Sequence, residues 1–127
     1  YKANRLTEKE CKDLHRKLKT FTANEKPYLD PDLKIADLAK TIGTSSHSLS
    51  YLFNQYLHIS YYDFINQYRI EEFKKIATDP HYERYTLTAM AHICGFSSRA
   101  SFFRSFKKST GITPNEYIKS LGLEDKE

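Results

Sequence analysis

The sequence predicts an all-α fold in which a long connector helix joins two helical lobes of similar build, with about seven helices in total. Three observations support this prediction. Only four glycines and four prolines interrupt the 127 residues, which leaves long stretches for helical periodicity. A helix-sized pattern of apolar and small residues occurs twice along the chain. From residue 44 to residue 79 there is neither glycine nor proline.

The first predicted element is a helix that begins at Thr7. Glu10 stands three residues later, a spacing at which each side chain can bind the backbone N–H of the other residue. A stripe at three- and four-residue steps is expected to face the core and consists of Cys11, Leu14, Leu18 and Phe21. Residues 24–31 contain two prolines with Asp30 between them, and they predict a turn that ends this helix.

An internal repeat organises the rest of the chain. Residues 35–43 match residues 87–95 at an offset of 52, so that Gly43 corresponds to Gly95. After the two glycines the offset is 53, which gives the second copy one extra turn residue. At that offset Leu49, Phe53, Ile59 and Ile65 correspond to Phe102, Phe106, Ile112 and Ile118. Self-similarity of this kind predicts two structural units of the same build.

Each copy is predicted to form a helix-turn-helix in a homeodomain-like lobe. Gly43 and Gly95 can adopt the positive φ that ends the first helix. A serine then caps the second helix, either Ser45 or Ser46 in one copy and either Ser97 or Ser98 in the other. A further helix is predicted after each, begun by Ser60 with Asp63 and by Thr113 with Glu116, where Pro114 takes the first helical position.

The stretch without glycine or proline permits a connector helix from about residue 61 to about residue 77. Its apolar residues form two stripes, Tyr61, Ile65 and Tyr68 on one side and Ile70, Phe73 and Ala77 on another. We expect one half of this helix to be buried in each lobe, which would fix the lobes relative to each other. The predicted organisation is an N-terminal helix and turn in residues 1–30, a first helix-turn-helix in residues 31–60, the connector in residues 61–79 and a second helix-turn-helix lobe in residues 80–127.

The composition argues against several functional classes. No apolar run approaches the roughly 18 residues of a membrane span, so we expect no membrane contact by this segment. Cys11 and Cys94 form no Cys-x-x-Cys pair, which disfavours a disulfide framework or zinc site and favours a cytoplasmic protein. The serines beside His47 lack an acidic partner and are better explained as helix caps than as nucleophiles. His81, His92 and Cys94 do not predict a metal site, because the last two point to different faces of a helix. No catalytic residue, metal or cofactor is predicted.

Positive charge is concentrated in the second copy. The net charge is only +4, but residues 84–115 contain no acidic residue. The basic residues of that stretch are Arg84, Arg99, Arg104, Lys107 and Lys108. A local excess of this kind attracts polyanions, although charge alone leaves a merely solvated basic face as an equally good explanation.

The second helix of the first copy is predicted to have an apolar and a polar face. The apolar face consists of Leu49, Leu52, Phe53 and Tyr56. The opposite face carries His47, Ser50, Tyr51 and Asn54 at positions i, i+3, i+4 and i+7. Histidine, serine and asparagine can exchange hydrogen bonds with base edges, and Tyr51 can contact a phosphate or a thymine methyl. For one helix alone an ordinary solvated face is the better explanation, and the repeat shifts the balance towards a binding face.

The corresponding face of the second copy carries Ala100, Phe103, Arg104 and Lys107, with Arg99 just before it. Because Phe102 and Phe106 suffice as core anchors, Phe103 is predicted to contact a thymine methyl. Packing of Phe103 against the neighbouring lobe is the alternative. Arg104 is predicted to read guanine through two hydrogen bonds, whereas the residues alone predict that Arg99, at the start of the helix, meets a phosphate. Phosphate contacts are predicted for Ser45, Ser46, Ser98, Lys107 and Lys108.

Two stretches of the sequence match a known family pattern. In the second copy the match consists of residues 91–96, Phe102, Arg104, residues 106–108, residues 111–114 and Tyr117. In the first copy it consists of residues 38–39, 49–50, 53–54, 64–66 and 68–70. Over nearly its whole length the chain thus resembles the AraC/XylS family of bacterial transcription regulators. Tyr51 departs from the pattern where a basic residue is common, Phe103 where a small polar one is common, and Phe73 where alanine is usual.

The resemblance implies two recognition helices that enter successive major grooves on one side of a DNA duplex. It places base contacts on His47, Ser50, Tyr51, Arg99, Ala100, Ser101 and Arg104. It also implies a regulator that positions RNA polymerase, and because the chain begins at Tyr1 we expect its sensory domain to lie outside this segment. The alternative is a helical adaptor that binds RNA polymerase or the sensory domain, which would be much less sensitive to salt than DNA binding.

Overall fold

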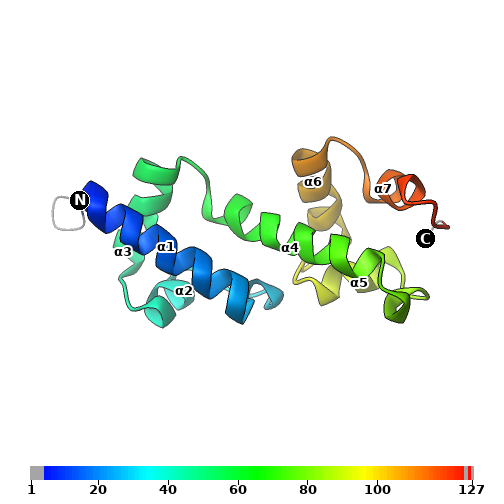
Figure 1. The fold of residues 1–127 in the computed structure, drawn as a ribbon, viewed down its shortest axis with the longest axis horizontal. Helices are drawn as coiled ribbons and strands as arrows, with labels where there is room; N and C mark the ends of the chain where they lie inside the picture. Colours follow the sequence, from blue (N-terminus) through cyan, green and yellow to red (C-terminus); the bar gives the residue numbers. More distant parts are fainter. Residues whose placement is uncertain (1–4, 125, 127) are drawn as a thin grey trace. The chain divides into compact units, whose positions relative to one another are not determined.

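A computed structural model describes residues 5–124 and residue 126, and this described part consists of helices and turns without a strand (Figure 1). Its α-helices are α1 (Glu8–Glu25), α2 (Ile35–Ile42), α3 (Ser46–Tyr51), α4 (Tyr61–Ala77), α5 (Leu87–Ile93), α6 (Arg99–Thr110) and α7 (Pro114–Ser120). The chain divides into two compact units, and the predicted all-α, two-lobed fold is confirmed. None of the helices in the described residues is long and apolar enough to cross a lipid bilayer.

The first unit contains residues 5–27 and Asp32–Phe64, and therefore α1, α2, α3 and the start of α4. Helix α1 begins with the predicted capping box, because the Thr7 N–H donates to Glu10 Oε1 at 2.9 Å and the Glu10 N–H donates to Thr7 Oγ1 at 3.1 Å. Its buried residues are Cys11, Leu18 and Thr22, whereas Leu14 and Phe21 are only half-buried. Thr22 follows Cys11 by eleven residues, about three helical turns, which places both on the same side.

The second unit contains Tyr28–Pro31 and residues 65–124 with residue 126, and therefore most of α4 together with α5, α6 and α7. Phe73 of α4 is fully buried, and its ring centroid lies 4.9 Å from that of Phe102 and 5.5 Å from that of Phe106. The phenylalanine thus fills the core of this unit. The other buried residues of the core are Ile70, Ile76, Ala77, Leu87, Met90, Ala91, Cys94, Phe96 and Ile118.

The internal repeat is visible in the helix limits. Helix α6 runs from Arg99 to Thr110, and in the first copy α3 continues without a break as a π-helical segment, Leu52–Leu57. At the offset of 53, Ser46 corresponds to Arg99 and Leu57 to Thr110, so the two helical stretches have the same ends. Ser45 and Ser98, the earlier and the later of the two candidates in their respective copies, are the residues that cap them.

The two turn glycines adopt the positive φ that the sequence predicts, 82° at Gly43 and 102° at Gly95. Their surroundings differ. A Cβ atom on Gly43 would meet only the flexible end of Lys17, at 3.6 Å from its Nζ. A Cβ atom on Gly95 would lie 2.1 Å from the backbone oxygen of Tyr28. Gly95 is therefore required by close packing as well as by its backbone conformation.

The turn at residues 28–31 packs in the second unit, whereas the sequence-based boundary at residue 30 groups it with the first lobe. Arg69 of α4, only 7% exposed, explains this arrangement. Its Nε donates to the Tyr28 oxygen at 2.7 Å and its Nη2 to the Asp30 oxygen at 3.0 Å. Tyr28 is buried and its ring stacks on Tyr68 at 5.5 Å. Burial, with a smaller contribution from the nearby Glu72 carboxylate, raises the pKa of Tyr28 to about 12.

The apolar stripes of α4 are divided differently from the prediction. The first stripe is not buried in the first unit alone. Tyr61 belongs to the first unit, whereas Ile65 and Tyr68 belong to the second. Tyr61 contacts Phe53 edge-on at 5.9 Å and donates its hydroxyl to the Leu33 oxygen at 3.0 Å. The residues of the second stripe, Ile70, Phe73 and Ala77, are buried in the second unit as predicted.

Candidate nucleic-acid interface

Of the two predicted binding faces, the one on helix α6 is the more strongly charged. Its inner side is anchored by Phe102 and Phe106, which are both fully buried. Of the residues predicted to contact DNA, Ala100, Arg104, Lys107 and Lys108 are exposed, and Arg99, Ser101 and Phe103 are half-buried. A buried aromatic anchor on one side thus presents the predicted base-reading and phosphate-binding side chains on the other.

The cap of α6 adds hydroxyl groups at the helix start. Ser98 Oγ accepts the Ser101 N–H at 3.1 Å, and Ser101 Oγ donates to the Ser98 backbone oxygen at 3.0 Å. In the first copy, Ser45 Oγ accepts the Ser48 N–H at 3.0 Å. Both cap serines are exposed and Ser46 is half-buried. Two of the hydroxyls predicted to meet phosphates, those of Ser45 and Ser98, therefore also satisfy backbone donors that α-helices leave unpaired at their first turn.

The matching helix of the first copy contains neither lysine nor arginine. Leu49, Leu52 and Phe53 are buried. Of the predicted outward residues, His47 and Asn54 are exposed, and Ser50 and Tyr51 are half-buried. Asn54 lies in the π-helical segment, so the α-helical step used to place it on the outward face does not apply beyond Tyr51. From Ser46 to Leu57 there is no aspartate, glutamate, lysine or arginine, and lysine and arginine occur at this kind of face only in the second copy.

Arg99 and Phe103 are in contact on the surface of α6. The central guanidinium carbon of Arg99 lies 4.2 Å from the centroid of the Phe103 ring. Arg99 Nη1 also donates to Thr88 Oγ1 of α5 at 3.4 Å. The Phe103 ring meets Phe102 edge-on at 5.6 Å and packs against the core of the second unit. The i, i+4 spacing of an arginine and an aromatic residue is a sequence signal that allows such a pair.

Both cysteines are free thiols buried in the structure. Burial raises the pKa of the Cys94 thiol to about 12, and burial also raises the pKa of Cys11. His92 is exposed while Cys94 is buried, which agrees with their placement on different faces of the helix. Among the described residues, no three histidine, cysteine or acidic side chains lie close enough to hold a metal ion.

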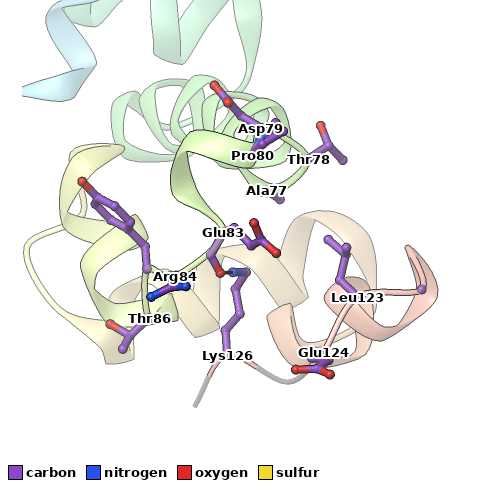
Figure 2. A pocket seen from close by; sticks show the side chains of 12 residues that line it. Ala77, Thr78, Asp79, Pro80, Glu83, Arg84, Thr86, Leu123, Glu124 and Lys126 are labelled. Carbon is purple, nitrogen blue, oxygen red and sulfur yellow. Dashed lines mark hydrogen bonds between the residues drawn. The ribbon is translucent and has the colours of Figure 1, made fainter.

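A shallow groove of about 730 Å³ lies in the second unit, away from the α6 face. Figure 2 shows Lys126 reaching across it towards Glu83, and its Nζ donates to the backbone oxygens of Tyr82 and Glu83. The groove is lined by charges of both signs, including Arg84 and Glu124. The groove therefore differs in charge from α6, which carries arginine and lysine but no acidic residue.

Comparisons with known proteins identify relatives of this helix-turn-helix chain. Residues 38–120 match the family described as "Helix-turn-helix domain". An uncharacterized HTH-type transcriptional regulator of Staphylococcus aureus strain COL is 40% identical over 86 residues, which make up 68% of this chain and 11% of that protein. The arabinose operon regulatory protein of Escherichia coli K12 is 32% identical over 97 residues, which make up 76% of this chain and 32% of that protein. The chain thus spans a minor part of the length of these relatives.

A solved structure shows the same fold. The C-terminal domain of the two-component response regulator YesN from Fusobacterium nucleatum superposes with a TM-score of 0.61 at 26% sequence identity. The superposition covers 84% of this chain and 98% of that chain. Because the family match extends over more than half of the chain and includes the helix-turn-helix of the second copy, the chain belongs to the AraC/XylS-type helix-turn-helix family of transcription-regulator DNA-binding domains, which is not a family of enzymes.

Proposed function

We propose that the chain binds specific sequences in double-stranded DNA, with α6 and the helix α3 with its π-helical continuation each lying in a major groove. The observation that supports this proposal is that each copy of the repeat contains one 12-residue helical stretch, residues 46–57 in the first and residues 99–110 in the second. Each stretch has a buried apolar side and an exposed polar side. Successive major grooves on one side of a duplex recur about every 34 Å, and we propose that spacing for the two helices.

The two helices are proposed to contribute differently. Helix α6 supplies the positive charge for phosphate binding, since it carries Arg99, Arg104, Lys107 and Lys108. The first helix, which has no lysine or arginine, offers His47, Ser50, Tyr51 and Asn54 for base contacts or for sensing groove shape. Base contacts in the second copy are proposed for Arg99, Ala100, Ser101 and Arg104, and phosphate contacts for Ser45, Ser46, Ser98, Lys107 and Lys108. An asymmetric DNA site follows from this difference.

We further propose that DNA binding by this chain serves the regulation of transcription in bacteria. The relatives described above are named as transcriptional regulators or as the regulatory protein of an operon. RNA polymerase and a sensory domain are the proposed protein partners of the regulator that contains this segment.

Affinity for DNA is expected to fall steeply as salt is added. With about four phosphates neutralised, binding should weaken by about 100-fold between about 50 mM and about 200 mM salt, because each contact releases condensed counterions. Fluorescence anisotropy with a labelled duplex measures this dependence. A helical adaptor that uses an apolar protein interface predicts little change over the same range, and no detectable binding to DNA at low salt would contradict the proposed function.

Replacing Arg104 by alanine should relax base preference at one or two positions of the site. The loss of a two-hydrogen-bond contact with guanine is expected to cost about 1–3 kcal/mol on the preferred sequence and much less on others. Lys108→Ala should instead weaken binding to all sequences alike and reduce the salt slope by about one. Lys75→Ala, an exposed lysine on α4, is the matched control and should change neither quantity. Indistinguishable effects of Arg104→Ala and Lys108→Ala would contradict the division into base-reading and phosphate-binding residues.

A further inference from the structure

We infer that Phe103 is a positioning residue, which holds the Arg99 guanidinium in one orientation so that Arg99 can read a guanine. The inference rests on the proposed DNA binding and assigns Phe103 a role different from direct contact with a thymine methyl. Arg99 is in this reading the residue that touches DNA, and Phe103 acts through it.

The geometry provides two restraints on one side chain. The guanidinium carbon of Arg99 lies 4.2 Å from the Phe103 ring centroid, within the range of a cation–π contact. On α5, Thr88 Oγ1 accepts a hydrogen bond from Arg99 Nη1 at 3.4 Å. The ring itself is held by its edge-on contact with the fully buried Phe102. A side chain that is mobile on most protein surfaces is therefore supported by a ring that is tied to the core.

Stability of helix α6 does not explain an arginine at this position. Arg99 is the first residue of the helix, directly after the N-cap Ser98, and the first turn contains no acidic residue. The N-terminal end of a helix carries partial positive charge, so a cation there is unfavourable for the helix itself. The contacts with Phe103 and Thr88 offset this cost and keep the charge at the end of α6 that recognition helices direct towards bases.

The first copy of the repeat shows that the scaffold does not require this group of residues. At the repeat offsets, Arg99 corresponds to Ser46, Phe103 to Ser50 and Thr88 to Ala36. The same helical turn is thus built there from small residues, while the core positions Leu49 and Phe53 keep their apolar character. The arginine, the ring and the threonine occur together only in the second copy, which indicates a role beyond packing.

A stacked guanidinium favours guanine over a phosphate as its target. The five N–H donors of arginine lie in one plane, and guanine presents O6 and N7 side by side in the major groove. Holding the plane in one orientation reduces the entropy lost when both hydrogen bonds form. A phosphate accepts hydrogen bonds over a much wider range of directions and gains less from a fixed plane.

Selection of bound sequences from a random DNA pool tests the inference with the wild-type chain and with Phe103→Leu, Phe103→Tyr, Arg99→Ala and the Arg99→Ala/Phe103→Leu double variant. The wild type should prefer guanine at one position of the site, and Arg99→Ala should abolish this preference. Phe103→Leu keeps an apolar side chain but removes the ring, and it should reduce the same preference by roughly tenfold. Phe103→Tyr keeps the ring and should retain the preference. The double variant should lose no more than Arg99→Ala alone.

The preference that depends on Arg104 serves as the internal control, because a misfolded second unit would lose it as well. It should be unchanged in Phe103→Leu. The inference is overturned if Phe103→Leu keeps the guanine preference, if it loses a thymine preference instead, or if it weakens all sequences equally. A wild-type chain that selects no sequence would overturn the proposed function, and the inference with it; each of the Phe103 outcomes overturns the inference alone.

Discussion

Replacing Gly95 by alanine is expected to destabilise the second unit by about 3–5 kcal/mol, because a positive φ and overpacking both disfavour a side chain there. Gly95 has a φ of 102°, which is strained for any residue that has a Cβ atom. The added Cβ would also lie 2.1 Å from the Tyr28 oxygen and 3.1 Å from the Leu29 Cα. These are backbone atoms, so the clash can be relieved only by moving the 28–31 turn away from α5.

Gly43→Ala is the matched control for Gly95→Ala, since it occupies the corresponding turn of the first copy. Its φ of 82° carries the same backbone strain, but an added Cβ would meet only Lys17 Nζ, at 3.6 Å. A loss of about 1–2 kcal/mol is expected. Amide hydrogen exchange in α2 and in α5 measures each unit separately. Equal losses in the two variants would show that close packing at Gly95 contributes nothing.

Arg69→Met is expected to destabilise the second unit by about 3 kcal/mol, because the buried Tyr28 carbonyl and the partly buried Asp30 carbonyl would lose their charged donor. Arg69 Nε and Nη2 hold the backbone oxygens of Tyr28 and Asp30, at 2.7 Å and 3.0 Å. Methionine keeps much of the apolar volume of the side chain but donates no hydrogen bond. Urea-induced unfolding followed by circular dichroism measures the loss, and faster hydrogen exchange of the amides in residues 28–31 should accompany it.

Lys74→Met, on the same helix, is the control for Arg69→Met. It removes a positive charge from α4 without removing a donor to the 28–31 turn. Lys74 pairs with Glu71 at 3.2 Å, and the Glu71 side chain is 65% exposed. An exposed pair of this kind contributes about 0–1 kcal/mol, so the control variant should remain close to the wild type in stability. If Arg69→Met were as stable as Lys74→Met, the turn at residues 28–31 would be held by apolar packing of Tyr28 alone.

Much of the local structure of this chain could be predicted because it depends on residues three or four positions apart. The Thr7 and Glu10 capping box and the Thr113 and Glu116 box form as their spacing indicates. At the repeat offset of 53, the first and last residues of α6 correspond to those of the matching helical stretch in the first copy. Burial of Phe102 and Phe106 follows from the same periodicity. Helical caps and stripes are local, and the sequence contains all that they require.

Parts of the candidate interface were not predictable in the same way. The π-helical turn at Leu52–Leu57 carries apolar residues at spacings that an α-helix accepts equally well. The sequence analysis predicts that Phe103 contacts a thymine methyl, whereas in the structure its ring packs against the Arg99 guanidinium of its own helix. Their i, i+4 spacing allows a contact, but whether the two side chains stack depends on Thr88 and Phe102, which position the guanidinium and the ring.

The helices, their caps, the duplicated helix-turn-helix and the family can all be inferred from the order of the residues. The folded chain was needed to show that the 28–31 turn packs in the second unit, that Arg69 is buried there, and that Gly95 has no room for a side chain. The physical reason is separation along the chain. Arg69 and Tyr28 are 41 residues apart, and the hydrogen bond between them exists only when the folded backbone brings a buried carbonyl and an arginine together.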